Sequence, residues 1–221
     1  MPMAPKDMRN GHNRVLTSQQ LWLKAMSEKI LMFQADTRLC SNSGRSIEDF
    51  IHLDWIGAPW DMSDIPKAPY IDGKALEVGN GALSLRSRSA MLAVTSEEHF
   101  EAIREAYQLK PYTPCCPSDI FFSFGLQWLN KEYPSRYQFQ IASPDVAATF
   151  AIERPDPKWK DFHKGDVFGI HKGKGGWKAF VNGGLENMKE LCPDAIPIFQ
   201  RCVCGNCEFE QDTSWFSWFL G

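Results

Sequence analysis

The chain has 221 residues, of which 43% are hydrophobic and 23% are charged, and its formal net charge is −3. These values are those of an ordinary globular domain and exclude a disordered chain, a collagen and a coiled coil. The negative charge argues against a protein whose whole surface binds nucleic acid or an anionic membrane. A chain of this length buries enough apolar surface to form a core without a metal or a disulfide.

The first residues of the chain are polar and lack the apolar run of a signal peptide. We therefore expect a flexible leader over residues 1–16 and a single domain over residues 17–221. No apolar stretch approaches the roughly 18 residues of a membrane span. Seven cysteines, an odd number, in a chain without a secretion signal favour free thiols in a reducing compartment. These features predict a cytoplasmic protein with no membrane partner.

Hydrophobic periodicity and capping residues predict the elements of the first half of the chain. A capping box at Thr17 and Gln20 precedes apolar residues at helical spacing, and a second box, at Thr95 and Glu98, precedes another such run. Alternating residues flank the turn Gly79-Asn80-Gly81. The expected elements are a helix over 18–35, a helical turn near 47–53, strands within 74–94 and a helix over 96–109.

The second half begins with a helix that starts near Pro117 and an alternating segment that reads as a strand. Ser143 and Pro144 suit the cap and first residue of a short helix, for which a strand is the alternative. Gly205-Asn206 suits a two-residue hairpin turn. The expected elements are helices over 118–132 and 144–150, a strand over 136–141, and hairpins over 166–182 and 198–210.

The mixture of helices and strands shows no regular βαβ alternation. It predicts an α+β fold in which about three amphipathic helices pack on a mainly antiparallel sheet, with a C-terminal β-hairpin that contains cysteines.

That hairpin carries the first candidate site, which is a structural zinc. Cys202 and Cys204 would share one face of a strand, and Cys204 and Cys207 would flank a tight turn. Thiolates at this spacing are typical zinc ligands, and Cys192 is a candidate fourth ligand. The alternatives are free cysteines packed in or beside a core strand and a redox pair.

A second candidate site is a cysteine nucleophile at the start of the helix over 118–132. The positive end of a helix lowers the pKa of a thiol, and a histidine on a neighbouring strand would act as the base. The alternative is a thiol buried before a core helix. The roles would fall on Cys115 or Cys116 as the nucleophile, His163 or His171 as the base, and Asp161 or Asp166 as the residue that orients the histidine.

Residues 158–178 hold six lysines interleaved with aromatic residues, a pattern that can bind nucleic acid. No nucleic-acid motif accompanies them, so a half-buried hairpin with a solvated lysine face is the preferred interpretation. The sequence therefore leaves two functional hypotheses. One is an intracellular interaction or regulatory domain with a protein partner and a structural zinc. The other is a hydrolase or transferase that uses a cysteine nucleophile.

Overall fold

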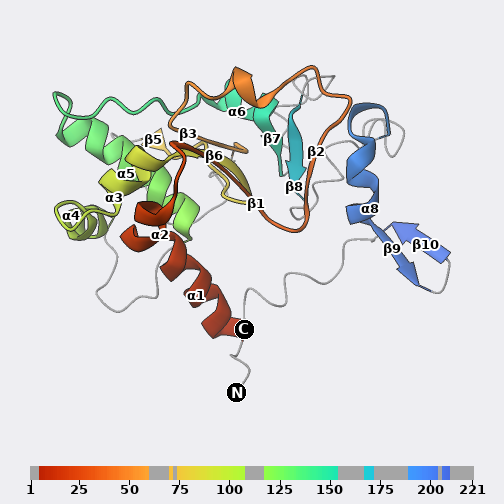
Figure 1. Ribbon diagram of the computed structural model, residues 1–221, viewed down its shortest axis with the longest axis horizontal. Helices are drawn as coiled ribbons and strands as arrows, with labels where there is room; N and C mark the ends of the chain where they lie inside the picture. Colours follow the sequence, from red (N-terminus) through yellow and green to blue (C-terminus); the bar gives the residue numbers. More distant parts are fainter. Residues whose placement is uncertain are drawn as a thin grey trace.

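The computed structural model describes residues 5–59, 70–71, 74–107, 117–153, 167–171, 189–203 and 206–209. Helices gather at one end, strands occupy the centre, and a short helix with a hairpin forms the other end (Figure 1). The fold is a single α+β domain, as predicted. Its elements are α1 (Pro5–Leu16), α2 (Gln19–Lys24), β1 (Lys29–Phe33), β2 (Thr37–Leu39), η1 (Ile47–Asp49), β3 (Trp55–Gly57), β4 (Tyr70–Ile71), β5 (Lys74–Ala75), β6 (Leu83–Ser87), α3 (Arg88–Val94), α4 (Phe100–Ala106), α5 (Ser118–Glu132), α6 (Pro144–Phe150), β7 (Ala151–Ile152), β8 (Gly169–His171), η5 (Pro193–Ala195), α8 (Ile196–Phe199), β9 (Gln200–Val203) and β10 (Asn206–Phe209).

The central sheet has the order β1-β6-β3, and both strand pairs are antiparallel. Every residue of β6 is buried, because this middle strand is covered on both faces. Leu83 and Leu85 join one hydrophobic cluster with Phe50 and Phe150. Arg86, one residue further along the strand, lies instead against the ring of Trp55. Side chains alternate between the two faces of a strand, so the apparently polar face of β6 lies inside the molecule.

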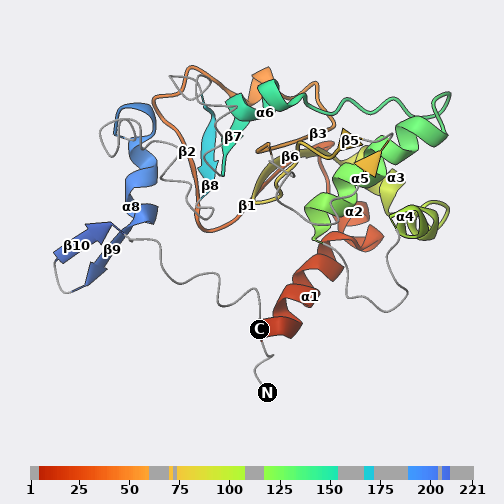
Figure 2. The same cartoon turned by 180° about the vertical axis from the view of Figure 1, so that it is seen from behind.

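A second sheet, of order β2-β8-β7, lies between the central sheet and α8 (Figures 1 and 2). Strand β8 pairs antiparallel with β2 and parallel with β7. The register places His171 opposite Thr37 and Ile170 opposite Ile152. It thereby brings His171 near the residues that precede β2 and follow β7.

The main hydrophobic core lies between the central sheet and helices α2, α3, α4 and α5. Its fully buried side chains include Trp22, Trp55, Met91, Phe121 and Phe122. Aromatic rings meet edge to face across this core, as between Trp22 and Phe122 at 5.7 Å. Among the described residues, no helix has the length and apolar character needed to cross a membrane.

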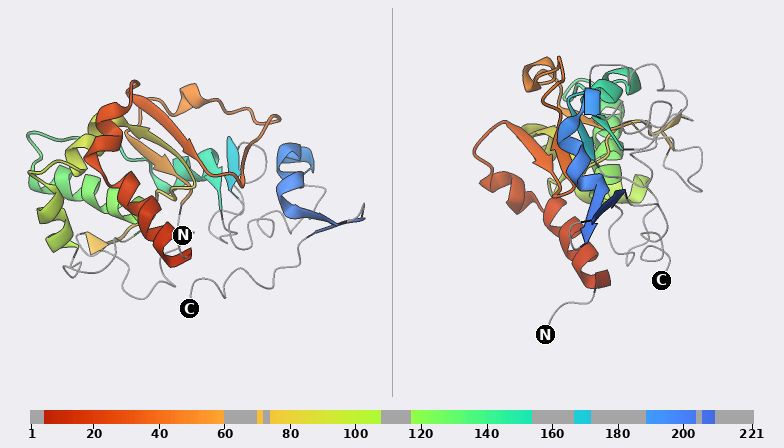
Figure 3. Two further views of the ribbon diagram at one scale, coloured as in Figure 1. Left: turned by 60° about the horizontal axis from the view of Figure 1, so that its bottom comes forward. Right: turned by 90° about the vertical axis from the view of Figure 1, so that its right-hand side faces the viewer.

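A disulfide joins Cys40, just after β2, to Cys192, just before η5, across 152 residues of sequence. It holds the last described segment of the chain beside the second sheet, and hairpin β9–β10 extends beyond α8 (Figure 3). The expectation that all seven cysteines are free thiols is therefore wrong for this pair. Spacing could not reveal the link, because the two residues meet only through the fold.

The N-terminal region differs from the sequence prediction. Residues 5–16 form helix α1, and the side chain of Asn13 accepts a hydrogen bond from the backbone N–H of Ser118 in α5. The helix predicted over 18–35 ends at Lys24, and β1 follows. The apolar residues of that segment have helical spacing, but Met26 and Phe33 are exposed. Pairing with β6 therefore overrides the helical pattern.

Two further segments were misassigned. Residues 90–94, predicted as part of a strand, belong to α3. A continuous apolar run of that length fits a buried helix as well as a buried strand. Residues 136–141 alternate between exposed and partly buried side chains as predicted, but they form no strand beyond a single bridge between Ile141 and Trp55. The side chain of Asn130 provides partners for both backbone polar groups of Phe139, which a neighbouring strand would otherwise supply.

Several other elements were predicted correctly. Helix α5 runs over 118–132, and α6 over 144–150, where the Ser143 hydroxyl accepts a hydrogen bond from the N–H of Val146. The turn near 47–53 is present as η1, and α4 lies within the helix predicted over 96–109. Strands β9 and β10 form the expected antiparallel hairpin. The segment 177–182 lies outside the described residues.

Candidate functional site

Five segments that are distant in sequence carry polar side chains around the second sheet and the loop before β6. We call this set the polar network, and it consists of Asp36, Asn80, Asp119, Glu153 and His171. Asp36 lies in the turn between β1 and β2, Asn80 precedes β6, and Asp119 lies in the first turn of α5. Glu153 follows β7, and His171 ends β8, so the sheet register brings these two together.

His171 lies between two carboxylates. Its Nε2 is 3.4 Å from Oδ1 of Asp36, and its Nδ1 is 3.7 Å from Oε1 of Glu153. Glu153 in turn accepts a hydrogen bond of 2.7 Å from the side-chain amide of Asn80. The His171 and Glu153 side chains are only 11% and 13% exposed, whereas Asp36 is 45% exposed. The imidazole is thus largely enclosed, with its more exposed carboxylate partner toward solvent.

Backbone contacts hold the turn that carries Asp36 against the start of β6. The N–H of Gln34 and the hydroxyl of Thr37 both donate to the carbonyl of Ala82, at 2.8 and 3.2 Å. The Asn80 side chain accepts from the N–H of Ala82 at 2.9 Å, which closes a tight Asx turn. Two sides of the polar network are therefore fixed to one short stretch of backbone.

Gly79 allows this loop to approach α5. Its φ of +125° is unfavourable for any residue with a side chain. A Cβ at this position would lie 2.2 Å from Nε1 of Trp55 and 2.3 Å from Oγ of Ser123. These two atoms share a buried hydrogen bond of 2.8 Å, and Ser123 donates onward to the carbonyl of Val78. The loop therefore rests directly on a polar contact between β3 and α5.

Asp119 is the carboxyl group of the network that belongs to a helix. Its Oδ2 accepts from the N–H of Gly81 at 3.1 Å, and its Oδ1 accepts from the N–H of Ile120 at 2.9 Å. Part of the residue remains exposed. Burial raises the pKa of Asp119, while the two N–H groups and the charge of Arg86 act in the opposite direction. A carboxyl group whose pKa is set by such opposing effects suits general acid–base catalysis.

Arg86 lies beneath Asp119 and is fully buried. Its guanidinium carbon is 4.7 Å from the centre of the Trp55 ring, and it lies within 6 Å of the Trp22 and Phe122 rings. Its Nε donates to the Ser84 hydroxyl, but Nη1 and Nη2 have no hydrogen-bond partner in the described part of the chain. Burial lowers the pKa of Arg86 to about 10, so the group remains positively charged at neutral pH.

The structure describes only part of the two sites predicted from sequence. Residues Cys115, Cys116, Asp161, His163, Asp166 and Cys204 lie outside the described residues. Of the predicted catalytic set, His171 is described, and it contacts carboxylates at both ring nitrogens. The cysteine nucleophile therefore stays a prediction, while its proposed base belongs to the polar network.

The zinc site needs one correction. Cys192 is bonded to Cys40, and a sulfur in a disulfide is not a thiolate ligand. Cys202 and Cys207 are directly opposite in the β9–β10 pair, so these two positions share one face of the hairpin. Within the described ranges, no group of three or more His, Cys, Asp or Glu residues could hold a metal ion. Zinc binding at the hairpin stays a prediction.

Sequence reasoning found one residue of the network, His171, and missed the other four. Asn80 was assigned only a turn, and Asp119 only the first turn of a helix. The available signal was the placement of polar residues at the ends of buried elements, where loops position functional groups. That signal gives no pairing, because only the register of the second sheet brings Glu153 beside His171.

Comparison with known proteins identifies the family of this chain but does not indicate an activity. Residues 4–171 match the model of a family described as "Protein of unknown function (DUF5672)". The match ends at His171 and therefore includes every member of the polar network. No curated protein and no solved structure matches the chain.

Proposed function

The chain belongs to this family of unknown function, DUF5672, and we propose that it is an enzyme that performs acid–base catalysis at the polar network. The observation that carries the proposal is the carboxyl group of Asp119, partly exposed, held by two backbone N–H groups and balanced between burial and a buried cation. Perturbed ionisable groups that converge from several segments are typical of active sites.

The proposed reaction is a hydrolysis or a group transfer to a hydroxyl group. Asp119 accepts the proton of the attacking hydroxyl group or water as its oxygen forms a bond to the electrophilic centre. The leaving group departs with the electron pair of the broken bond and takes a proton from His171. Asp36 and Glu153 lie beside the two ring nitrogens of that imidazole. The carboxylate oxygens also accept hydrogen bonds from substrate hydroxyl groups.

A panel of 4-nitrophenyl esters, phosphates and glycosides tests this proposal, because release of 4-nitrophenol identifies the class of bond that is cleaved. For the responsive class, Asp119→Asn should lower the rate by about 10²–10⁴-fold. Asp145→Asn is the matched control, since Asp145 is an exposed carboxylate in the first turn of α6. Equal rates for the wild type and both variants would contradict the assignment of Asp119.

An interaction domain is the second candidate function. Met26 and Phe33 are exposed apolar side chains just before and at the end of β1, which is an edge strand of the described central sheet. Exposed edge strands pair readily with another chain. Light scattering of the wild type and of Phe33→Lys would reveal self-association through this edge. If the wild type has the mass of one chain at all concentrations, the edge strand does not mediate self-association.

A further inference from the structure

Resting on the proposed function, we propose that Arg86 is a positioning residue for the reaction, whose buried positive charge acts on the Asp119 carboxylate across the space that Gly81 leaves empty. The two side chains come from β6 and α5, and the loop before β6 passes between them. Arg86 does not need to contact substrate. It stabilises the charge of the group that does.

The geometry around Gly81 shows that both groups border one space. A Cβ on Gly81 would lie 3.1 Å from Nη2 of Arg86, 3.4 Å from Oδ2 of Asp119 and 2.9 Å from Cβ of Asp119. Any larger residue would therefore displace one group or the other. The N–H of Gly81 also donates to Asp119, so the same residue orients the carboxylate and leaves room for the cation.

The surroundings of Arg86 explain why its charge acts at this point. Aromatic rings of Trp22, Trp55 and Phe122 cover the guanidinium, and Nε is bonded to the Ser84 hydroxyl. The two remaining nitrogens are buried and have no hydrogen-bond partner within the described residues. Water does not screen a charge in such a place, so its field extends further than at the surface. Asp119 is the carboxylate that acts on Arg86.

Arg86 and Asp119 form no direct ion pair among the contacts of the described residues, which matters for catalysis. A direct pair would occupy the oxygens of the carboxylate and stabilise its charged form so strongly that it would be a poor base. At a greater separation, Arg86 offsets only part of the effect of burial and leaves the carboxylate oxygens available. The other groups that act on Asp119 are the backbone N–H groups of Gly81, Ile120 and Asp119 itself.

The test is a titration of the Asp119 side-chain carboxyl carbon by ¹³C NMR in the full-length protein, with the resonance assigned from its loss in Asp119→Asn. Replacing the cation in Arg86→Met should move the midpoint of Asp119 upward by about one pH unit or more. Arg86→Lys keeps the charge and should stay closer to the wild type. Arg88→Met is the matched control, because Arg88 lies two residues away and its Nε donates to the carbonyl of Trp22.

A second measurement needs no substitution at the buried site. In the wild type, the side-chain nitrogen resonances of Arg86 should shift with pH at the same midpoint as the Asp119 carboxyl. Absence of that shift, or an unchanged Asp119 midpoint in folded Arg86→Met, would overturn the proposal. If the titrations are coupled but Asp119→Asn retains full activity, the electrostatic link stands and the proposed function fails.

Discussion

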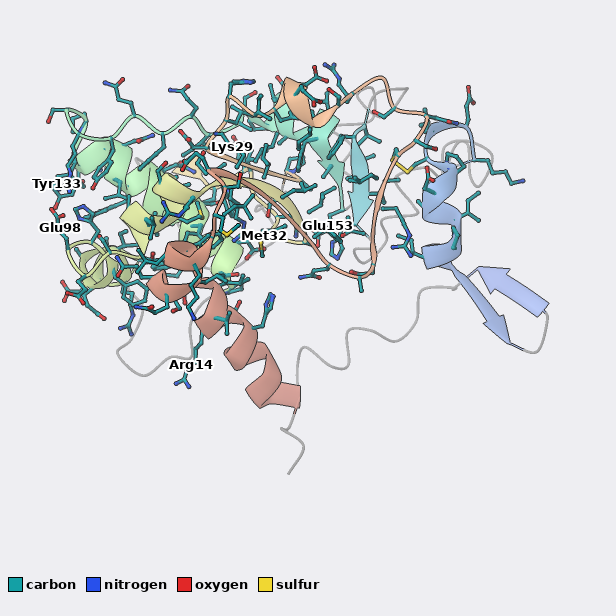
Figure 4. The ribbon with its side chains drawn as sticks, in the orientation of Figure 1. Arg14, Lys29, Met32, Glu98, Tyr133 and Glu153 are labelled. Atoms are coloured by element: carbon teal, nitrogen blue, oxygen red, sulfur yellow. A yellow bond between two sulfur atoms is a disulfide. The ribbon has the colours of Figure 1, made fainter. Side chains whose placement is uncertain are left out.

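The described structure encloses two histidines in different surroundings, one among the helices and one in the second sheet. His99 lies beside Glu98 and Tyr133 at the helical end, whereas His171 lies beside Glu153 at the second sheet (Figure 4). Both are largely removed from solvent, at 0% and 9% exposure. Depth of burial therefore does not distinguish them, and the neighbouring groups do.

His99 is held by aromatic residues. Its Nε2 is 3.0 Å from the Tyr137 hydroxyl, and its ring centre is 5.0 Å from that of Tyr133. Burial lowers the pKa of His99, and the charge of Arg136 acts in the same direction, while Glu98 opposes them. The ring therefore stays neutral at neutral pH, and we interpret its role as structural.

His171 has a carboxylate at each ring nitrogen, whereas His99 has one carboxylate and two aromatic rings, and this difference suits His171 to proton transfer. Asp36 and Glu153 lie beside the two ring nitrogens of His171, whereas His99 has one carboxylate, Glu98, at 3.6 Å from Nε2 and is otherwise packed against Tyr133 and Tyr137. The comparison teaches that a buried histidine is a functional candidate when acidic side chains lie at both of its ring nitrogens. Three experiments can break or sharpen this distinction.

The largest expected effect comes from removing the Cys40–Cys192 disulfide by substituting both residues with alanine. The link closes a loop of 152 residues beside β2, and its loss should reduce the free energy of unfolding by about 3–5 kcal/mol. Hydrogen exchange should speed up in β2 and β8, which carry the surroundings of His171, and stay slow around His99. Equal acceleration of hydrogen exchange around both histidines would show that the two regions are not independent.

Matched glutamine substitutions compare the histidines directly. His99→Gln should cost about 2–3 kcal/mol, because it removes a ring from an aromatic cluster and leaves the Tyr137 hydroxyl poorly matched. His171→Gln should cost about 1 kcal/mol or less, since its amide can still contact Asp36 or Glu153. Urea unfolding at pH 7.5 measures both. A larger loss at His171 than at His99 would reverse the assignment of structural and functional roles.

The smallest expected effect on the free energy of unfolding comes from replacing Asp119, whose pKa is raised by burial. A raised pKa means that the folded protein holds this proton more tightly than the unfolded chain. That stabilisation is complete below the ordinary value of 3.8 and is lost as the pH rises through the folded value. The charged carboxylate therefore weakens the fold at neutral pH.

Asp119→Asn should consequently raise the free energy of unfolding at pH 7 by about 0.5–1 kcal/mol, and the gain should vanish toward pH 4. An amide oxygen can still accept from the N–H groups of Gly81 and Ile120. Asp145→Asn in α6 is the control and should show no such pH dependence. A loss of stability in Asp119→Asn at neutral pH would mean that Asp119 serves the fold and not a reaction.

Short-range sequence signals were sufficient to predict helices whose ends are specified by nearby residues. Ser143 and Pro144 start α6 at the positions that capping and the fixed φ of proline predict, whereas α5 begins at the predicted residue with Pro117 as its N-cap and no side-chain cap hydrogen bond. The alternation of Tyr137 and Phe139 with exposed neighbours was also correct. In these cases the interactions that specify the structure lie within a few residues of sequence.

Short-range sequence signals failed where other parts of the fold supply the partners of a segment's backbone hydrogen bonds. Residues 29–33 have helical spacing but pair with β6, and residues 136–141 have strand alternation but are held by the side chain of Asn130. Periodicity reports which side chains are buried. It does not report which partner supplies the backbone hydrogen bonds, and that partner decides the secondary structure.

The sequence by itself determined the α+β class, the bounds of helices α5 and α6, and His171 as a candidate base. Only the tertiary structure decided that His171 meets Asp36 and Glu153, since the register of β2, β8 and β7 sets those contacts. It also placed Arg86, which alternation had assigned to a polar face, in an aromatic cage below Asp119. The physical reason is that a charge is stabilised by neighbours in space, and those neighbours come from segments up to 135 residues away along the chain, as with Asp36 and His171.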